Sequence, residues 1–206
     1  MLELYFAPNT ISVAVAIALE EVGADYVTRR IDFSASEQTS EAYAVLNPKG
    51  RVPTLVSDDV PLTETGALLE FAHGLNPDKG LVPAGAVDAA KMREAMFYFA
   101  STMHVNHAHK LRGARWADKQ ESWDDMQAKV PETMTASCDY VEHSLLKGPY
   151  LLGERFSLAD PYLYMICTWV EGDGVDLSQF PKIRAFMAEM EKRPSVQAVR
   201  EAGMIT

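Results

Sequence analysis

The first third of the chain shows short apolar runs separated by turn-forming residues. Leu2–Phe6 is mostly apolar and then meets Pro8 and Asn9, which predicts a short strand that ends in a loop. Ser12–Val22 is rich in Ala, Val, Ile and Leu and is followed by Gly23, which predicts a largely buried helix closed by a glycine. The same criteria predict strands at residues 26–32, 54–57 and 60–62, the last two joined in a hairpin across Asp58 and Asp59, and helices at residues 41–46 and 64–73.

The order of these elements predicts a mixed sheet with helices packed on it, in an N-terminal α/β domain that spans residues 1–75. Residues 76–88, NPDKGLVPAGAVD, concentrate Pro, Gly and Asp, and we expect them to form a linker. Residues 89–206 contain no convincing strand, and we expect an all-α domain there. Its helices are predicted at residues 89–112, 131–146, 158–170, 180–193 and 195–202.

The composition excludes several classes of protein. Apolar residues make up 48% of the chain and charged residues 23%, as in ordinary soluble globular proteins. The formal net charge of −10 repels phosphate and argues against nucleic-acid binding. No stretch is apolar enough to span a bilayer, and the first residues, MLELYFAP, lack the pattern of a signal peptide, so we expect a cytoplasmic protein without membrane contacts. The cysteines, Cys138 and Cys167, form no CxxC or zinc spacing, which argues against disulfides and metal sites.

Three segments carry the most specific pattern in the chain. They are NPKGRVPTLV at residues 47–56, LTET at residues 62–65 and SLAD at residues 157–160. Together they resemble the cytosolic glutathione transferase superfamily over essentially the whole chain, and the bacterial beta-class enzymes are the nearest match. The resemblance implies a thioredoxin-like N-terminal domain with a mixed four-stranded sheet, an all-helical C-terminal domain, glutathione as co-substrate and a homodimer.

The segments around Val52 and Glu64 are expected to bind glutathione. A cis bond between Val52 and Pro53 would turn the N–H and C=O of Val52 toward solvent, where an extended peptide could pair with them. The resemblance assigns this pairing to the cysteinyl part of glutathione. Glu64 and Thr65 are predicted to open a helix, where backbone N–H groups favour an anion and the Glu64 carboxylate can accept from an ammonium. The resemblance also places Ser101 at this ligand.

A hydrogen-bond donor toward the glutathione sulfur is needed, because a free thiol with a pKa of about 8.5 is mostly protonated at neutral pH. Beta-class enzymes normally place a cysteine where Ile11 stands, so that chemistry is absent here. Ser12 is the first choice, because its hydroxyl, the neighbouring N–H groups and the helix dipole can stabilise a thiolate; its alternative role is a plain helix cap. Asn9 and Thr10 lie in the same loop and compete with it. Tyr5 is the donor to the glutathione sulfur only if the strand register shifts by one residue.

The predicted helical domain carries the other candidate site residues. By resemblance, His104 matches a histidine that reaches the region of the thiol in beta-class enzymes, and histidine can donate or titrate near neutral pH. His107 can share its helix face. The expected electrophile pocket combines aromatic and basic side chains suited to a planar or anionic substrate: Tyr5, His107, Arg112, Arg115 and Trp116. The nearby histidines lack a carboxylate or cysteine to complete a metal site, so we expect none.

Two further features qualify this interpretation. Ser157 and Asp160 have the spacing of a helix capping box and are expected to be structural. Beta-class enzymes often use a lysine after the second strand to contact the glycine end of glutathione, whereas this chain has Ser34-Ala-Ser-Glu there.

The predicted function is conjugation of glutathione to small electrophiles, as in detoxification. The alternatives are a glutathione-dependent disulfide reductase or peroxidase, and a non-catalytic glutathione-binding module of the same fold.

Overall fold

The computed structural model describes residues 1–206, which divide into two compact units. The first unit comprises residues 1–84 and 190–206, and the second comprises residues 85–189. No helix in either unit combines the length and the apolar character needed to cross a membrane.

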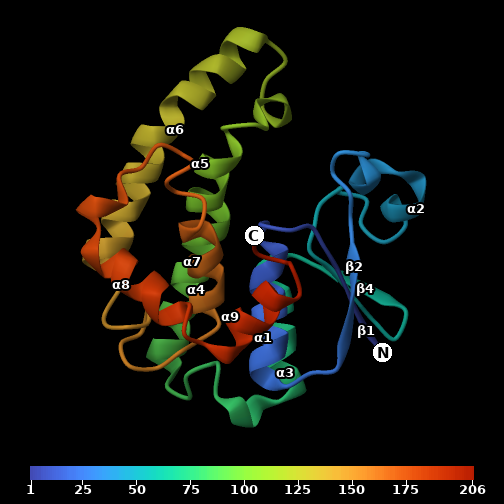
Figure 1. The fold of residues 1–206 in the computed structure, drawn as a ribbon, viewed down its shortest axis with the longest axis vertical. Helices are drawn as coiled ribbons and strands as arrows, with labels where there is room; N and C mark the ends of the chain where they lie inside the picture. Colours follow the sequence, from blue (N-terminus) through green and yellow to red (C-terminus); the bar gives the residue numbers. More distant parts are fainter. The chain divides into compact units, whose positions relative to one another are not determined.

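The first unit is built on a four-stranded sheet (Figure 1). β2 runs parallel to β1, whereas β3 runs antiparallel to both of its neighbours, β1 and β4. The predicted mixed sheet with helices is therefore confirmed. The strands are β1 (Leu2–Phe6), β2 (Tyr26–Arg30), β3 (Thr54–Ser57) and β4 (Val60–Thr63), and the helices are α1 (Ser12–Val22), α2 (Glu41–Ala44), α3 (Thr65–Leu75) and α9 (Pro194–Glu201).

Alternate residues of β1 serve the two faces of the sheet, as the pleat of a strand requires. Leu4 is fully buried, and α1, which is buried throughout residues 12–19, packs against β1 and α3. Tyr5 belongs to the second face, where its ring lies 5.9 Å from that of Tyr43 on α2. This second cluster also contains Val52 and Ile31. The short helix α2 therefore covers the face of the sheet from which the Val52 loop departs.

The second unit is helical, which confirms the predicted class of this part of the chain. Two of its helices differ from expectation. The helix predicted at residues 89–112 is interrupted by a π-helical turn at residues 99–103, and α6 begins well before Pro131, which lies inside the helix. The first turns of α6 are largely exposed and polar, so they lack the apolar period on which the prediction relied. The helices are α4 (Ala86–Tyr98), α5 (His104–Ala108), α6 (Gln120–Tyr140), α7 (Ala159–Cys167) and α8 (Pro181–Met190).

The C-terminal segment packs with the first unit, although the sequence-based division placed residues 89–206 in one helical domain. At one end of α1, the Glu21 carboxylate accepts from Nε and Nη2 of Arg193 at 2.8 and 2.7 Å and from Oγ of Ser195 at 2.5 Å. At the other end, the N–H of Asn9 donates to the carbonyl of Met204 at 2.9 Å. These contacts are made between distant residues, and helical periodicity carries no information about them.

Candidate functional site

The peptide bond between Val52 and Pro53 is cis. Val52 is largely buried, with 9% of its surface exposed, yet neither its N–H nor its C=O has a hydrogen-bond partner within the chain. Backbone groups at buried positions are nearly always paired, so this residue offers one donor and one acceptor to an outside partner. The arrangement suits an extended peptide that runs alongside Val52.

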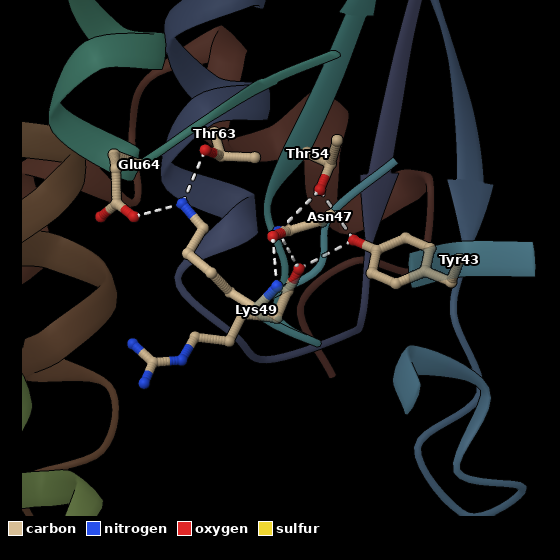
Figure 2. Close-up of polar contacts among 7 residues, drawn as sticks. Tyr43, Asn47, Lys49, Thr54, Thr63 and Glu64 are labelled. Carbon is tan, nitrogen blue, oxygen red and sulfur yellow. Dashed lines mark hydrogen bonds and ion pairs between the residues drawn. The ribbon is translucent and has the colours of Figure 1, made fainter. Parts of the chain in front are cut away.

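Buried polar side chains fix the loop immediately before Val52 (Figure 2). The carbonyl oxygen of Arg51 accepts from Nδ2 of Asn47 at 2.7 Å and from the hydroxyl of Tyr43 at 2.8 Å. Both side chains also contact Oγ1 of Thr54, at 3.1 Å from Asn47 and 2.8 Å from Tyr43. Burial raises the pKa of Tyr43, which keeps the phenol neutral as a donor. Hydrogen bonds to Arg51 and Thr54, on either side of Val52 in the chain, therefore fix the position of its peptide groups.

Glu64 occupies the position immediately before helix α3, which begins at Thr65, one residue later than predicted. Its φ of 73° and ψ of 117° are a sparsely populated conformation for a residue with a side chain, and such conformations cluster at functional sites. The Glu64 carboxylate makes no capping bond. It accepts from Nζ of Lys49 at 2.5 Å, while the same ammonium donates to Oγ1 of Thr63 at 2.7 Å (Figure 2). Glu64 thus already holds an ammonium group.

Thr10 and Ser12 form a hydroxyl pair in the loop between β1 and α1. Their oxygens lie 2.6 Å apart, and the Thr10 hydroxyl donates to the carbonyl of Ala7 at 2.7 Å. Ser12 has no exposed surface, and its Oγ lies 3.3 Å from both the N–H and the carbonyl oxygen of Ala7. Thr10 is partly exposed. Of the two residues, only Thr10 therefore has exposed surface.

Asn9 and Tyr5 are engaged in the first unit itself. Asn9 has a positive φ of 56°, and its side-chain amide exchanges hydrogen bonds with Thr206: Nδ2 donates to Oγ1 at 2.7 Å, and Oδ1 accepts from the backbone N–H at 3.0 Å. Tyr5 packs on the cluster beneath α2 and lies 3.4 Å from the carboxylate of Glu3. Asn9 therefore anchors the C-terminal segment, and Tyr5 contributes to the packing around Val52.

In the second unit, the structure joins His104 and His107 to Trp169, which follows α7. The His107 ring is stacked on the Trp169 ring at 4.4 Å between centroids with 25° between planes, and the His104 ring lies 5.2 Å from Trp169. Nδ1 of His107 is 2.7 Å from Oδ2 of Asp173. The predicted pairing of the two histidines on one helix face is therefore accompanied by an indole and a carboxylate from a distant segment.

The other candidate residues of the second unit are Trp116, Arg112, Arg115 and Ser101. Trp116 makes an edge-on contact with the ring of His109 at 4.5 Å, and Arg112 and Arg115 are exposed around the short 3-10 helix at residues 113–115. Ser101 is exposed in the π-helical turn. The candidate residues of the expected electrophile pocket thus belong to both units: Tyr5 to the first, and His107, Arg112, Arg115 and Trp116 to the second.

Several residues of these sites were missed by sequence reasoning. Asn47 and Lys49 stand inside the NPKGRVPTLV segment, so their position was a usable signal. Asp173 had no such signal, because it is 66 positions from His107. No group of three or more His, Cys, Asp or Glu side chains in residues 1–206 is arranged to hold a metal ion.

The comparisons with known proteins cover both units. The model of the glutathione S-transferase N-terminal domain matches residues 1–73, and that of the C-terminal domain matches residues 94–194. A glutathione transferase homologue from Sulfitobacter, solved with bound glutathione, is 58% identical with a TM-score of 0.98, and the match covers 99% of each chain. A beta-class glutathione S-transferase from Sphingomonas chungbukensis is 26% identical with a TM-score of 0.84, over 97% of this chain and 98% of that one. Glutathione S-transferase GstA from Escherichia coli O157:H7 is 28% identical over 95% of this chain and 96% of its own. The chain therefore belongs to the glutathione S-transferase family.

Proposed function

We propose that this protein transfers the thiolate of glutathione to small electrophiles, as a cytoplasmic detoxification enzyme. The observation that carries the proposal is the free peptide unit of Val52 beside a carboxylate that already holds an ammonium, because glutathione is an extended peptide with an ammonium at one end. The Sulfitobacter homologue with bound glutathione supports the same ligand.

In the proposed complex, the cysteinyl backbone pairs with the N–H and C=O of Val52. The γ-glutamyl ammonium takes the place of the Lys49 ammonium at Glu64, and the γ-glutamyl carboxylate meets the first N–H groups of α3 at Thr65. Lys49 is then released to neutralise a carboxylate of the ligand. This supplies a cation in a chain that lacks the beta-class lysine after β2.

Glutathione affinity should fall about tenfold in the Glu64→Gln variant, since the loss is one charge-assisted hydrogen bond at a largely exposed carboxylate. Calorimetric titration with glutathione and with its analogue lacking the α-amino group tests the assignment. The parent protein should prefer glutathione, and the variant should bind both ligands equally. Glu94→Gln is the matched control, because Glu94 is also paired with a lysine on the surface, at 2.6 Å. A preference for glutathione that survives in Glu64→Gln contradicts the proposed subsite.

The cysteines support conjugation over chemistry that needs a protein thiol. Both lie in the second unit and are buried. Burial raises the pKa of Cys138 to about 12 and that of Cys167 well above its usual value, so neither is a reactive thiolate at neutral pH. A disulfide reductase that passes through a protein mixed disulfide is therefore disfavoured.

Other activities occur among relatives of this chain. One relative from Caenorhabditis elegans, 29% identical over 83% of this chain, is named a probable maleylacetoacetate isomerase. The direct test is a comparison, with and without glutathione, of aryl-halide conjugation against disulfide and peroxide reduction. Glutathione-dependent conjugation as the fastest reaction supports the proposal. Reduction alone favours the reductase or peroxidase alternative, and binding without turnover favours a non-catalytic module.

We also propose that the protein is a homodimer, as the family resemblance implies. Multi-angle light scattering at micromolar concentration should give twice the chain mass of 22.8 kDa. A monomer mass under these conditions contradicts the proposal.

A further inference from the structure

Three buried side chains behind Val52 form a hydrogen-bond network (Figure 2). Tyr43 comes from α2, Asn47 from the turn that follows it and Thr54 from the start of β3, and their exposed fractions are 3%, 1% and 0%. Oδ1 of Asn47 accepts from the backbone N–H of Lys49 at 3.2 Å, so the two hydrogens on Nδ2 point into the network. The orientation of the amide is therefore fixed by the turn itself.

Only one arrangement of the other protons pairs them all within the network. Nδ2 of Asn47 donates to the Arg51 carbonyl at 2.7 Å and to Oγ1 of Thr54 at 3.1 Å. The Thr54 hydroxyl then donates to the Tyr43 oxygen at 2.8 Å, and the Tyr43 hydroxyl donates to the Arg51 carbonyl at 2.8 Å. If Tyr43 donated to Thr54 instead, the Thr54 proton would have no acceptor in the network. The Arg51 carbonyl therefore accepts two hydrogen bonds, which use both of its lone pairs.

This carbonyl belongs to the same planar peptide group as the N–H of Val52, because a peptide plane joins the carbonyl of one residue to the N–H of the next. The peptide is trans, so the N–H points opposite to the carbonyl, and the two hydrogen bonds at Arg51 fix its direction. The same bonds withdraw electron density from the peptide group, which makes its N–H a stronger donor. The Val52 N–H has no partner within the chain. It is therefore the one group of this peptide unit that is left for a ligand.

We propose that this network aims and strengthens the N–H of Val52 as the donor to a carbonyl of the ligand. The network residues Tyr43, Asn47 and Thr54 are then positioning residues of the glutathione site. Tyr43 and Asn47 act through the Arg51 carbonyl, and Thr54 acts through Tyr43. The proposal rests on the proposed function in one respect: the carbonyl is that of the cysteinyl residue of glutathione.

The Tyr43→Phe variant keeps the ring and removes one of the two donors to the Arg51 carbonyl. Glutathione should bind to it about fivefold more weakly in calorimetric titration of the full chain. Tyr26→Phe is the matched control in the same unit, because the Tyr26 hydroxyl donates outside the network, to Oε1 of Glu20 at 2.8 Å. The affinity of this control should equal that of the parent protein. Equal affinities of Tyr43→Phe and the parent protein overturn the proposal.

A pair of substitutions at Thr54 separates the hydroxyl group from packing. Thr54→Val keeps the shape of the buried side chain and removes the proton that orders the Tyr43 hydroxyl, so glutathione affinity should fall about threefold. Thr54→Ser restores the hydroxyl and should restore the affinity, although it removes a buried methyl group. A loss in Thr54→Ser as large as that in Thr54→Val shows an effect of packing alone and overturns the role of Thr54.

A measurement on the free protein distinguishes this proposal from the proposed function. The nitrogen-15 resonance of the Val52 amide responds to electron withdrawal by hydrogen bonds at the Arg51 carbonyl, with or without glutathione. It should move upfield in Tyr43→Phe and stay in place in Tyr26→Phe. An unchanged Val52 resonance in Tyr43→Phe overturns the network and leaves the proposed function standing. An upfield shift in a protein that does not bind glutathione supports the network and removes the proposed function.

Discussion

Replacement of Asp160 with alanine is expected to lower the free energy of unfolding of the second unit by about 3–5 kcal/mol. The Asp160 carboxylate has no exposed surface. It accepts from the N–H of Leu151 at 2.7 Å and from the N–H and hydroxyl of Ser157 at 2.7 and 2.9 Å. Alanine would leave these three donors buried without an acceptor, and the penalty for each unsatisfied group adds to the loss of the bonds.

Guanidinium titration followed by tryptophan fluorescence measures this effect, because Trp116, Trp123 and Trp169 all lie in the second unit. Asp176→Ala is the matched control. Asp176 also accepts from a backbone N–H at a helix start, that of Ser178 at 3.0 Å, but its carboxylate is exposed. Its removal should cost far less, since water replaces the lost bond. Equal losses in the two variants contradict a buried capping role for Asp160.

In the Thr10→Val variant, kcat for conjugation should fall about a hundredfold. The loss of one preorganised hydrogen-bond donor to an anion in an active site typically has an effect of this size. Thr10 is the hydroxyl-bearing residue of the loop with exposed surface, since Ser12 has none. When Ser12 donates across the 2.6 Å contact, the Thr10 proton is free to turn from the Ala7 carbonyl toward the sulfur. Glutathione affinity should change little, because the hydroxyl bonds the thiolate more strongly than the thiol.

Ultraviolet absorbance of the bound thiolate across pH provides the second measurement for Thr10. Removal of a donor that favours the charged form raises the pKa of an acid, so the thiol of bound glutathione should titrate at higher pH in Thr10→Val. Ser12→Ala should give a smaller rise, because Ser12 acts only through Thr10. Asn9→Ala is the control, since its amide is engaged with Thr206. A larger effect in Ser12→Ala than in Thr10→Val would identify Ser12 as the direct donor.

Local signals in the sequence predicted most elements of the fold. Apolar runs ended by Pro8, by Gly23 and by the Asp58-Asp59 turn predicted β1, α1 and the β3–β4 hairpin. Asp58 and Asp59 both have positive φ. The start of α6 was missed, because its exposed polar turns have no apolar period, and a proline inside the helix was taken as a boundary. The chain segments that carried a turn or a buried face were thus the predictable ones.

The candidate site was predictable where its residues are neighbours in the chain. Val52, Pro53, Glu64 and Thr65 belong to two short motifs, and the family resemblance places a cis bond before Pro53, as the structure has it. The choice between Ser12 and Thr10 depends on burial, which the loop sequence does not encode: Ser12 has no exposed surface, whereas Thr10 is partly exposed. The Asp173 contact joins residues 66 positions apart, and such contacts depend on tertiary packing.

Because residues 190–206 pack with residues 1–84, the second unit is an insertion within the first. On the ribosome, the inserted unit is complete once residue 189 has emerged, and it can fold as soon as its own core is available. Glu21 must wait for Arg193, and Asn9 for Met204, before either end of α1 has its partners. The proposed glutathione-binding unit therefore begins synthesis first and reaches its full set of native contacts last.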